Sequence, residues 1–140
     1  MSAPTLRTVA SPDALDQIED ALAGLWTLHP HVPEDVRIRL GIAVSEIAAN
    51  IIEHATAAVG RLVRLQMWAH VRENDLLIKF TDDGIPMSAD LPSGDMPAGE
   101  MPDELAERGR GLALARAVLN RLTYHRADDV NHWELLIDHR

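Results

Sequence analysis

One stretch in the middle of the chain carries four polar side chains at spacings that bring them together on a helix. Glu46, Asn50 and His54 follow one another at intervals of four residues, and Glu53 lies beside them. On an α-helix these side chains form one polar ridge next to an apolar, core-facing stripe. Such a ridge is either the floor of a polar site or a solvated helix face. The second is the usual case for charged residues, and the ridge alone does not decide between them.

A second group of polar residues follows a short apolar strand pattern. Asp82, Asp83 and Gly84 come directly after the alternating residues 76–80. A carboxylate just past a buried strand can accept a hydrogen bond deep in a pocket, and glycine lets the backbone come close to a ligand. Asp-Gly is also one of the commonest turn signals, so an ordinary turn explains the same residues.

The third group consists of Arg108, Gly109, Arg110, Gly111 and Leu112, ahead of a helical pattern. Glycines at a helix N-terminus let backbone N–H groups surround an anion, and the helix dipole favours negative charge there. The two arginines add cationic donors. The segment lacks the Gly-Lys-Ser/Thr of a P-loop and does not complete G-x-G-x-x-G, so it resembles only part of a phosphate cradle.

Composition limits the classes of protein to which the chain can belong. Its 140 residues, 46% hydrophobic and 25% charged, fit one folded domain over residues 1–140. The absence of cysteine excludes disulfides, thiolate metal sites and cysteine nucleophiles. The net charge of −9 argues against a nucleic-acid partner. No segment resembles a signal peptide or a membrane span, so we expect a cytoplasmic protein that contacts no membrane.

The polar ridge belongs to the second of two helices predicted in the first part of the chain. Residues 6–10 alternate in polarity and predict a short edge strand. Ser11 as N-cap and Pro12 in the first helical position begin a helix that should end near residue 28. After a proline-rich break, the helix that carries the ridge should run over residues 34–57.

Two strand pairs and a third helix complete the predicted fold. Residues 62–71 and 76–80 alternate in polarity and predict a hairpin. A helix that begins at the glycines of the third group precedes a closing hairpin, residues 122–126 and 132–138, with 128–131 in its turn. These elements predict an α+β fold, a two-layer sandwich of a mixed or antiparallel sheet with helices packed on one face.

The segment 85–107 lies between the second and third groups and shows no periodicity. It is rich in proline, methionine and acidic residues. A loop of this length inside a compact domain is usually functional. Its acidity favours a cover or a partner surface over a nucleic-acid clamp.

The order of the three groups along the chain resembles the GHKL ATPase superfamily, which has the Bergerat ATP-binding fold, and within it the anti-sigma-factor serine kinases. Residues 46–55, Glu-Ile-Ala-Ala-Asn-Ile-Ile-Glu-His-Ala, match the N box. Asp82-Asp-Gly84 matches the first glycine box, and Gly109-Arg-Gly111-Leu-Ala-Leu114 matches the second. Each motif is weak alone, whereas three in this order and at suitable spacing are fairly specific.

The resemblance implies a role for each group. Asn50 would offer its amide oxygen to Mg²⁺, and Glu46, one turn earlier, would be the general base that takes a proton from an attacking hydroxyl. Asp82 would accept the adenine amino group, and Gly84 would let the base pack closely. The implied cofactors are therefore ATP or ADP and Mg²⁺.

The resemblance also assigns the phosphates and the lid. Residues 85–107 would close over the nucleotide as a lid. The glycines of the second box would wrap the phosphates. The whole cofactor-binding segment would comprise Arg108, Gly109, Arg110, Gly111 and Leu112.

Two positions depart from the family pattern. Many relatives have a glycine where this chain has Pro86, which fixes φ, removes a backbone donor and should stiffen the entry to the lid. Ala113 replaces a glycine that is often found in the second box. Neither change touches the residues assigned to the nucleotide.

The leading hypothesis is an ATP-dependent protein serine/threonine kinase that acts as an anti-sigma factor. It would bind a sigma factor in one state and phosphorylate an anti-sigma-factor antagonist in another, and the resemblance also implies a homodimer. The alternative, motivated by Pro86, is a nucleotide-binding regulatory module that senses ATP and ADP without transferring phosphate. A histidine kinase catalytic domain is expected least, because no helical segment with a phospho-accepting histidine precedes the motifs.

Overall fold

The computed structural model describes residues 3–55, 60–86, 94–95 and 110–139 of the chain. Within them the chain forms three helices and six strands. In chain order these are β1 (Leu6–Val9), α1 (Pro12–Leu28), α2 (Glu34–Ala55), β2 (Arg64–Val71), β3 (Asp75–Asp82), β4 (Gly94–Asp95), α3 (Arg110–Val118), β5 (Arg121–Ala127) and β6 (Val130–Asp138). None of these helices is long and apolar enough to cross a membrane.

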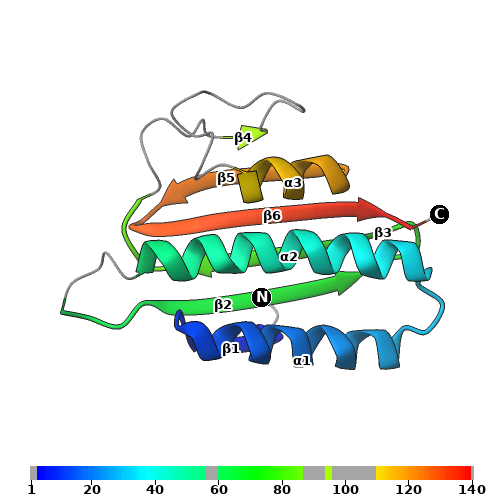
Figure 1. Ribbon diagram of the computed structural model, residues 1–140, viewed down its shortest axis with the longest axis horizontal. Helices are drawn as coiled ribbons and strands as arrows, with labels where there is room; N and C mark the ends of the chain where they lie inside the picture. Colours follow the sequence, from blue (N-terminus) through cyan, green and yellow to red (C-terminus); the bar gives the residue numbers. More distant parts are fainter. Residues whose placement is uncertain (1–2, 56–59, 87–93, 96–109, 140) are drawn as a thin grey trace.

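The strands form one sheet in the order β1-β2-β3-β6-β5-β4, and each pair of neighbours is antiparallel. All three helices cover the same face of this sheet (Figure 1). The predicted α+β fold, a two-layer sandwich with helices on one face, is confirmed. Of the two predicted kinds of sheet, mixed or antiparallel, the described strands form the antiparallel one.

The core lies between the sheet and the helices, and α2 runs along its middle. Phe80 of β3 and Trp133 of β6 are paired in register and fully buried. Eight residues of α2 are buried against this layer at helical spacing. Because this apolar stripe fixes the rotation of α2 about its axis, the ridge with Glu46 and Asn50 points toward α3 and not into the sheet.

The boundaries of the first elements lie within two residues of the predictions. Ser11 has the extended backbone of an N-cap, although its side chain makes no cap hydrogen bond to the described backbone. α2 ends at Ala55, and residues 56–57 of the predicted helix lie outside the described residues. β2 begins at Arg64, and β3 runs on to Asp82, which therefore belongs to the sheet.

The closing hairpin has a shorter turn than predicted. Only Asp128 and Asp129 connect its strands, with φ of 53° and 63°. A two-residue turn with φ above zero at both positions matches the twist of the strands, and aspartate tolerates this conformation. The prediction that Val130 and Asn131 belong to the turn was wrong, because both lie in β6 and Asn131 is opposite Asp82.

The segment 85–107, predicted to be irregular, contains the strand β4. Its two residues pair with Tyr124 and Thr123 of β5. Such a short strand leaves no periodicity in the sequence, so pattern reasoning did not find it. Residues 87–93 and 96–107 lie outside the described residues, and with them most of the predicted lid.

Candidate functional site

The polar ridge of α2 meets the start of α3. A small pocket of about 90 Å³ opens between the two helices. It is lined by Glu46, Ala49, Asn50, Glu53, Gly111 and Leu112. The structure therefore brings the first and third sequence motifs together, although they are far apart in the chain. His54 of the same ridge is not among the lining residues.

Gly111 lies in the first turn of α3, where this helix approaches Glu46. A Cβ atom added at Gly111 would collide with Oε2 of Glu46, so a side chain here would displace this carboxylate from its place beside α3. Leu112 is buried and fixes the start of α3 against the core. The free N–H groups and partial positive charge of a helix N-terminus favour an anion. The field of α3 therefore favours a negatively charged group at this pocket.

The other residues predicted for this segment are described only in part. Arg110 is the first residue of α3, and its side chain is not described. Arg108 and Gly109 lie outside the described residues. In the described part of the segment, Gly111, Leu112 and the backbone at the start of α3 form the candidate phosphate-binding surface.

Asn50 projects into this pocket with an incomplete set of hydrogen bonds. Its Nδ2 atom is buried and has no hydrogen-bond partner among the described residues. An unsatisfied buried amide is costly, which makes this position a candidate contact for a ligand. A half-turn of the amide exchanges its nitrogen and oxygen, and an amide oxygen is a ligand that Mg²⁺ accepts. The site thus fits the cation that the sequence motifs imply.

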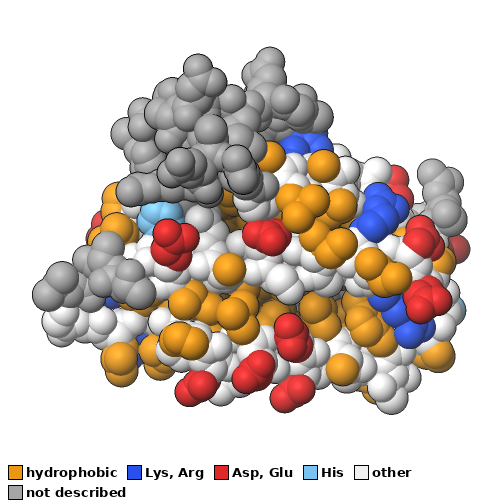
Figure 2. All heavy atoms as spheres, viewed as in Figure 1, with side chains coloured by type: hydrophobic (Ala, Val, Ile, Leu, Met, Phe, Trp, Pro, Cys, Tyr) orange, Lys and Arg blue, Asp and Glu red, His pale blue; other side chains and the backbone are white. Residues whose placement is uncertain are grey.

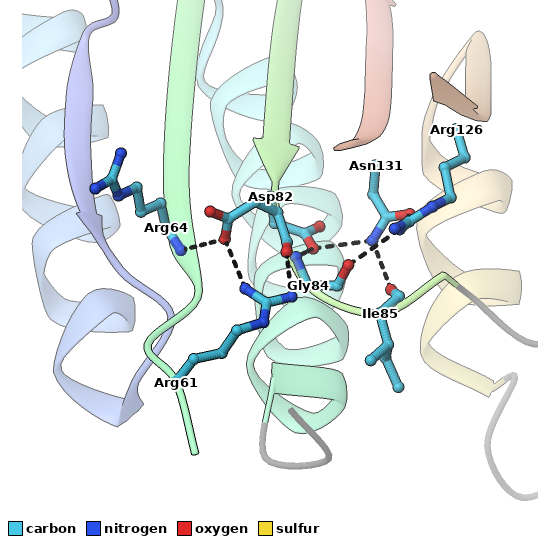
Figure 3. Close-up of polar contacts among 8 residues, drawn as sticks. Arg61, Arg64, Asp82, Gly84, Ile85, Arg126 and Asn131 are labelled. Carbon is cyan, nitrogen blue, oxygen red and sulfur yellow. Dashed lines mark hydrogen bonds and ion pairs between the residues drawn. The ribbon is translucent and has the colours of Figure 1, made fainter. Parts of the chain in front are cut away.

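Asp82 forms a second polar region at the end of β3 (Figure 3). The residue is only 6% exposed. Its Oδ1 accepts hydrogen bonds from Gly84 N at 3.1 Å and from Asn131 Nδ2 at 2.9 Å. Burial raises the pKa of Asp82 above its ordinary value of 3.8, and these two hydrogen bonds act in the opposite direction. Because both bonds end on Oδ1, Oδ2 is the atom that can accept a donor from a ligand.

Asn131 holds this region together, and sequence reasoning did not assign it to the site. Its Nδ2 also donates to the carbonyl of Ile85 at 2.8 Å. Its Oδ1 accepts from the hydroxyl of Tyr124 at 2.6 Å and from Arg126 at 3.0 Å. The sequence contains a signal for this role. Asn131 lies two residues before Trp133, on the buried face of β6, where a polar residue needs hydrogen-bond partners.

The neighbours of Asp82 explain why the Asp-Asp-Gly motif is not an ordinary turn. Asp83 points to β2, where its Oδ1 accepts from the backbone of Arg64 at 2.7 Å and pairs with Arg61 at 3.6 Å. A Cβ atom at Gly84 would lie 3.0 Å from Asp82 Oδ1 and 3.3 Å from Val63, so a side chain here would require Asp82 or Val63 to shift slightly. The motif is a strand end, fixed on one side to β2 and on the other to β6.

Arg126 and Pro86 complete the described part of this region. Arg126 donates to the carbonyl of Gly84 at 3.0 Å, so the residue after Asp83 is held from β5 as well as from β6. The described chain continues through Ile85 to the exposed Pro86, from which residues 87–93 follow outside the described residues. The segment leading to the predicted lid therefore starts from a fixed backbone.

The chain was compared with protein families, curated proteins and solved structures. Residues 8–135 match the family described as the histidine kinase-like ATPase domain. A search of curated proteins found no significant match. Among solved structures, the Acinetobacter baumannii histidine kinase AdeS is similar with a TM-score of 0.51 and 15% sequence identity. The similarity covers 96% of this chain and 68% of that one, and at this identity it concerns the fold.

Proposed function

Because the chain belongs to the histidine kinase-like ATPase domain family, we propose that it binds Mg²⁺-ATP and transfers the terminal phosphoryl group to a protein hydroxyl. The observation that carries the proposal is the pocket between α2 and α3. It combines a carboxylate at Glu46, an amide nitrogen at Asn50 with no partner among the described residues, and a glycine at position 111 whose replacement would displace that carboxylate. A site for nucleotide binding alone does not need the carboxylate.

The two polar regions divide the nucleotide between them. The pocket at Glu46 has a volume of about 90 Å³, the space of about three water molecules. That is the size of a phosphate group or of a cation with its water, so we assign this end to the phosphates. Asp82 accepts the hydrogen bonds from Gly84 and Asn131 at Oδ1, and we assign its Oδ2 to the adenine amino group.

Each residue of the phosphate end has a proposed task. When bound, Mg²⁺ supplies charge neutralisation on the phosphate oxygens, and Asn50 is its protein ligand. Gly111 and the N-terminus of α3 orient the phosphates through backbone N–H groups. Glu46 takes the proton of the acceptor hydroxyl while that oxygen bonds to the terminal phosphorus and ADP departs with the bridging oxygen.

The proposed acceptor is a serine or threonine of an anti-sigma-factor antagonist. In this proposal the protein is a cytoplasmic homodimer that sequesters a sigma factor and releases it according to the phosphorylation state of the antagonist. The three-motif resemblance of the sequence supports it, together with the presence of both Glu46 and Asn50 in one pocket.

A transfer assay with separate binding and chemistry readouts tests this function. ATP binding is measured by calorimetry with and without Mg²⁺, and labelled ATP is then mixed with candidate antagonist proteins. We expect Glu46→Gln to lower transfer about a thousandfold, the range for loss of a general base, while ATP affinity stays close to that of the wild type. Glu73→Gln, an exposed residue of the β2–β3 turn, is the charge-matched control.

The chemistry of the product separates the possible acceptors. Phosphoserine and phosphothreonine survive acid, whereas phosphohistidine does not. Acid-stable label on the antagonist supports the proposal, whereas acid-labile label would show that the phosphoryl group is transferred to a histidine. ATP binding without transfer to any partner contradicts the kinase proposal.

A nucleotide-sensing module without phosphoryl transfer is the alternative function. The position of Pro86 favours it, because the proline directly follows a fixed backbone at Ile85 and limits the rearrangement of the next segment. In that case Glu46→Ala leaves control of the partner unchanged. Asp82→Asn strongly weakens nucleotide binding in both cases.

A further inference from the structure

A groove on the outer surface of the helical layer leads to Glu46. It has a volume of about 610 Å³ and lies between α1 and α2, with Leu114 of α3 on its border. Trp26 lines it from α1, and Ile38, Gly41 and Ile42 line it from α2. Figure 2 looks onto this layer, where hydrophobic side chains gather between the two helices with acidic side chains on both sides.

The groove exposes aliphatic side chains that the described chain does not cover. Ile38 is 57% exposed, Ile42 36% and Leu114 45%. Three large aliphatic residues around one groove form a contiguous apolar surface, which on soluble proteins marks an interaction site. Their spacing along α2, with Ile38 and Ile42 four residues apart, gives a strip suited to apolar side chains of a partner segment.

Gly41 indicates that this surface is kept open. A Cβ atom added to it would meet nothing within 4 Å, so the packing of the described chain does not require glycine. An interior glycine weakens a helix relative to alanine. At the floor of the groove, the missing side chain leaves room for an occupant that comes close to the backbone of α2.

The charge of the groove and its connection to the pocket with Asn50 indicate the kind of occupant. Glu19 and Glu46 are the charged residues that line the groove, so its electrostatic potential favours a neutral or basic segment. A second copy of this chain, with a net charge of −9, is a poor match. Glu46 lines both the groove and the pocket with Asn50, so one carboxylate joins the two.

We propose that the groove between α1 and α2 binds the phosphoacceptor segment of the partner protein. The segment carries apolar side chains for the groove, a serine or threonine at the Glu46 end, and basic or neutral neighbours. This inference rests on the proposed kinase function and adds the surface that selects the substrate. It makes Ile42 and Gly41 specificity residues that contact the partner and not the nucleotide.

The test uses an array of synthetic peptides, each with one serine or threonine and with leucine, arginine or aspartate at defined flanking positions. Binding of the full chain is measured without nucleotide and with Mg²⁺ and a non-hydrolysable ATP analogue. The wild type should retain peptides with leucine and arginine flanks and reject those with aspartate. Ile42→Asp and Gly41→Leu should each weaken this binding at least tenfold, while ATP binding stays unchanged.

Matched controls lie on the same helical layer outside the groove. Leu28→Asp places the same charge at a residue that is 76% exposed and does not line the groove. Gly24→Leu changes a glycine of α1 whose Cβ position is equally open. Both controls should keep the peptide selection of the wild type.

Three results would overturn the groove assignment. The first is a wild type that retains no serine or threonine peptide, and the second is unchanged selection in Ile42→Asp and Gly41→Leu. The third is a dimer that Ile42→Asp converts to a monomer in sedimentation velocity, because a second copy would then cover the groove. ATP binding and Glu46-dependent transfer can still be measured after each of these results, so the proposed function is tested independently of the groove.

Discussion

The two polar regions of the site differ in how completely the protein satisfies their hydrogen bonds. Around Asp82, the carboxylate, the amide of Asn131 and the carbonyls of Gly84 and Ile85 all have protein partners. In the pocket at Glu46, by contrast, the Nδ2 of Asn50 is buried without one among the described residues. The protein fixes the position of Asp82 and leaves only its Oδ2 for a ligand, whereas the amide of Asn50 is not fixed by a hydrogen bond from its Nδ2 to a described residue.

The difference has an energetic meaning. A satisfied buried network keeps its geometry and resists disruption, because removing any member leaves the others unpaired. An unpaired buried amide lowers stability until a ligand arrives, which is a common compromise at functional sites. We therefore expect mutations in the Asp82 region to weaken the protein or its binding, and truncation of Asn50 to spare the fold.

The largest effect on ATP affinity should come from Asp82→Asn. This change replaces the acceptor assigned to adenine and places an amide beside two protein donors. We expect ATP affinity to fall about a hundredfold, or about 2.7 kcal/mol, as measured by calorimetry. Asp83→Asn is the neighbouring control, since Asp83 faces Arg61 and Arg64, and its affinity should stay within a few-fold of the wild type. Equal losses in both variants would contradict the adenine assignment.

Asn131→Ala tests the satisfied network through stability. It leaves the Tyr124 hydroxyl, Arg126 and Asp82 each short of one partner. We expect unfolding free energy in urea to fall by about 2–3 kcal/mol. Asn120→Ala removes an exposed asparagine that accepts one bond from Asp138 N, and should cost less than about 1 kcal/mol. A comparable cost for the two would mean that the network adds no stability.

Gly111→Ala tests the contact that joins the two helices at the pocket. The new methyl group collides with Glu46, so α3 or the carboxylate must move. Because the carboxylate can turn away, we expect the free energy of unfolding to change by less than about 1 kcal/mol, together with weaker ATP binding where Glu46 leaves the pocket. Gly24→Ala, at an open position of α1, should instead gain about 0.5–1 kcal/mol. A stable Gly111→Ala protein with normal ATP affinity would argue against the close approach.

Asn50→Ala should affect stability in the opposite direction from Asn131→Ala. It removes the unpaired amide and replaces asparagine by a better helix former, for a gain of about 0.5 kcal/mol. The dependence of ATP binding on Mg²⁺ should disappear in the same variant. Destabilisation by more than about 1 kcal/mol would show that the amide has a structural partner.

The smallest effect we expect is a pH dependence from Asp82. Burial raises its pKa in the folded protein, whereas Asn131, Gly84 and Arg126 act in the opposite direction and limit the shift. A raised pKa contributes stability below the ordinary value of 3.8, and this contribution is lost as pH rises through the folded pKa. In urea unfolding, the free energy of unfolding of the wild type relative to Asp82→Asn should therefore decline as pH rises from 3.8 to the raised pKa of the folded protein. A stability of the wild type relative to Asp82→Asn that increases with rising pH would contradict a raised pKa of Asp82.

Much of the fold was predictable because helices and strands have local periods. The apolar repeat over residues 34–55 placed Glu46 and Asn50 on one side of a helix before any tertiary contact was known. Alternation predicted the β2–β3 hairpin to within two residues at each end. The strand β4 was missed, because two residues are too few to show a period.

The sequence by itself determined which residues share an element and a face, including the ridge with Glu46 and the strand that ends at Asp82. Only the tertiary structure decided which elements meet. The pairing of β3 with β6 puts Asn131 opposite Asp82, and the packing of α3 on α2 puts Gly111 against Glu46. The physical reason is that periodicity is a property of neighbouring residues. Register and packing are set by the burial of side chains from distant parts of the chain, which no local pattern records.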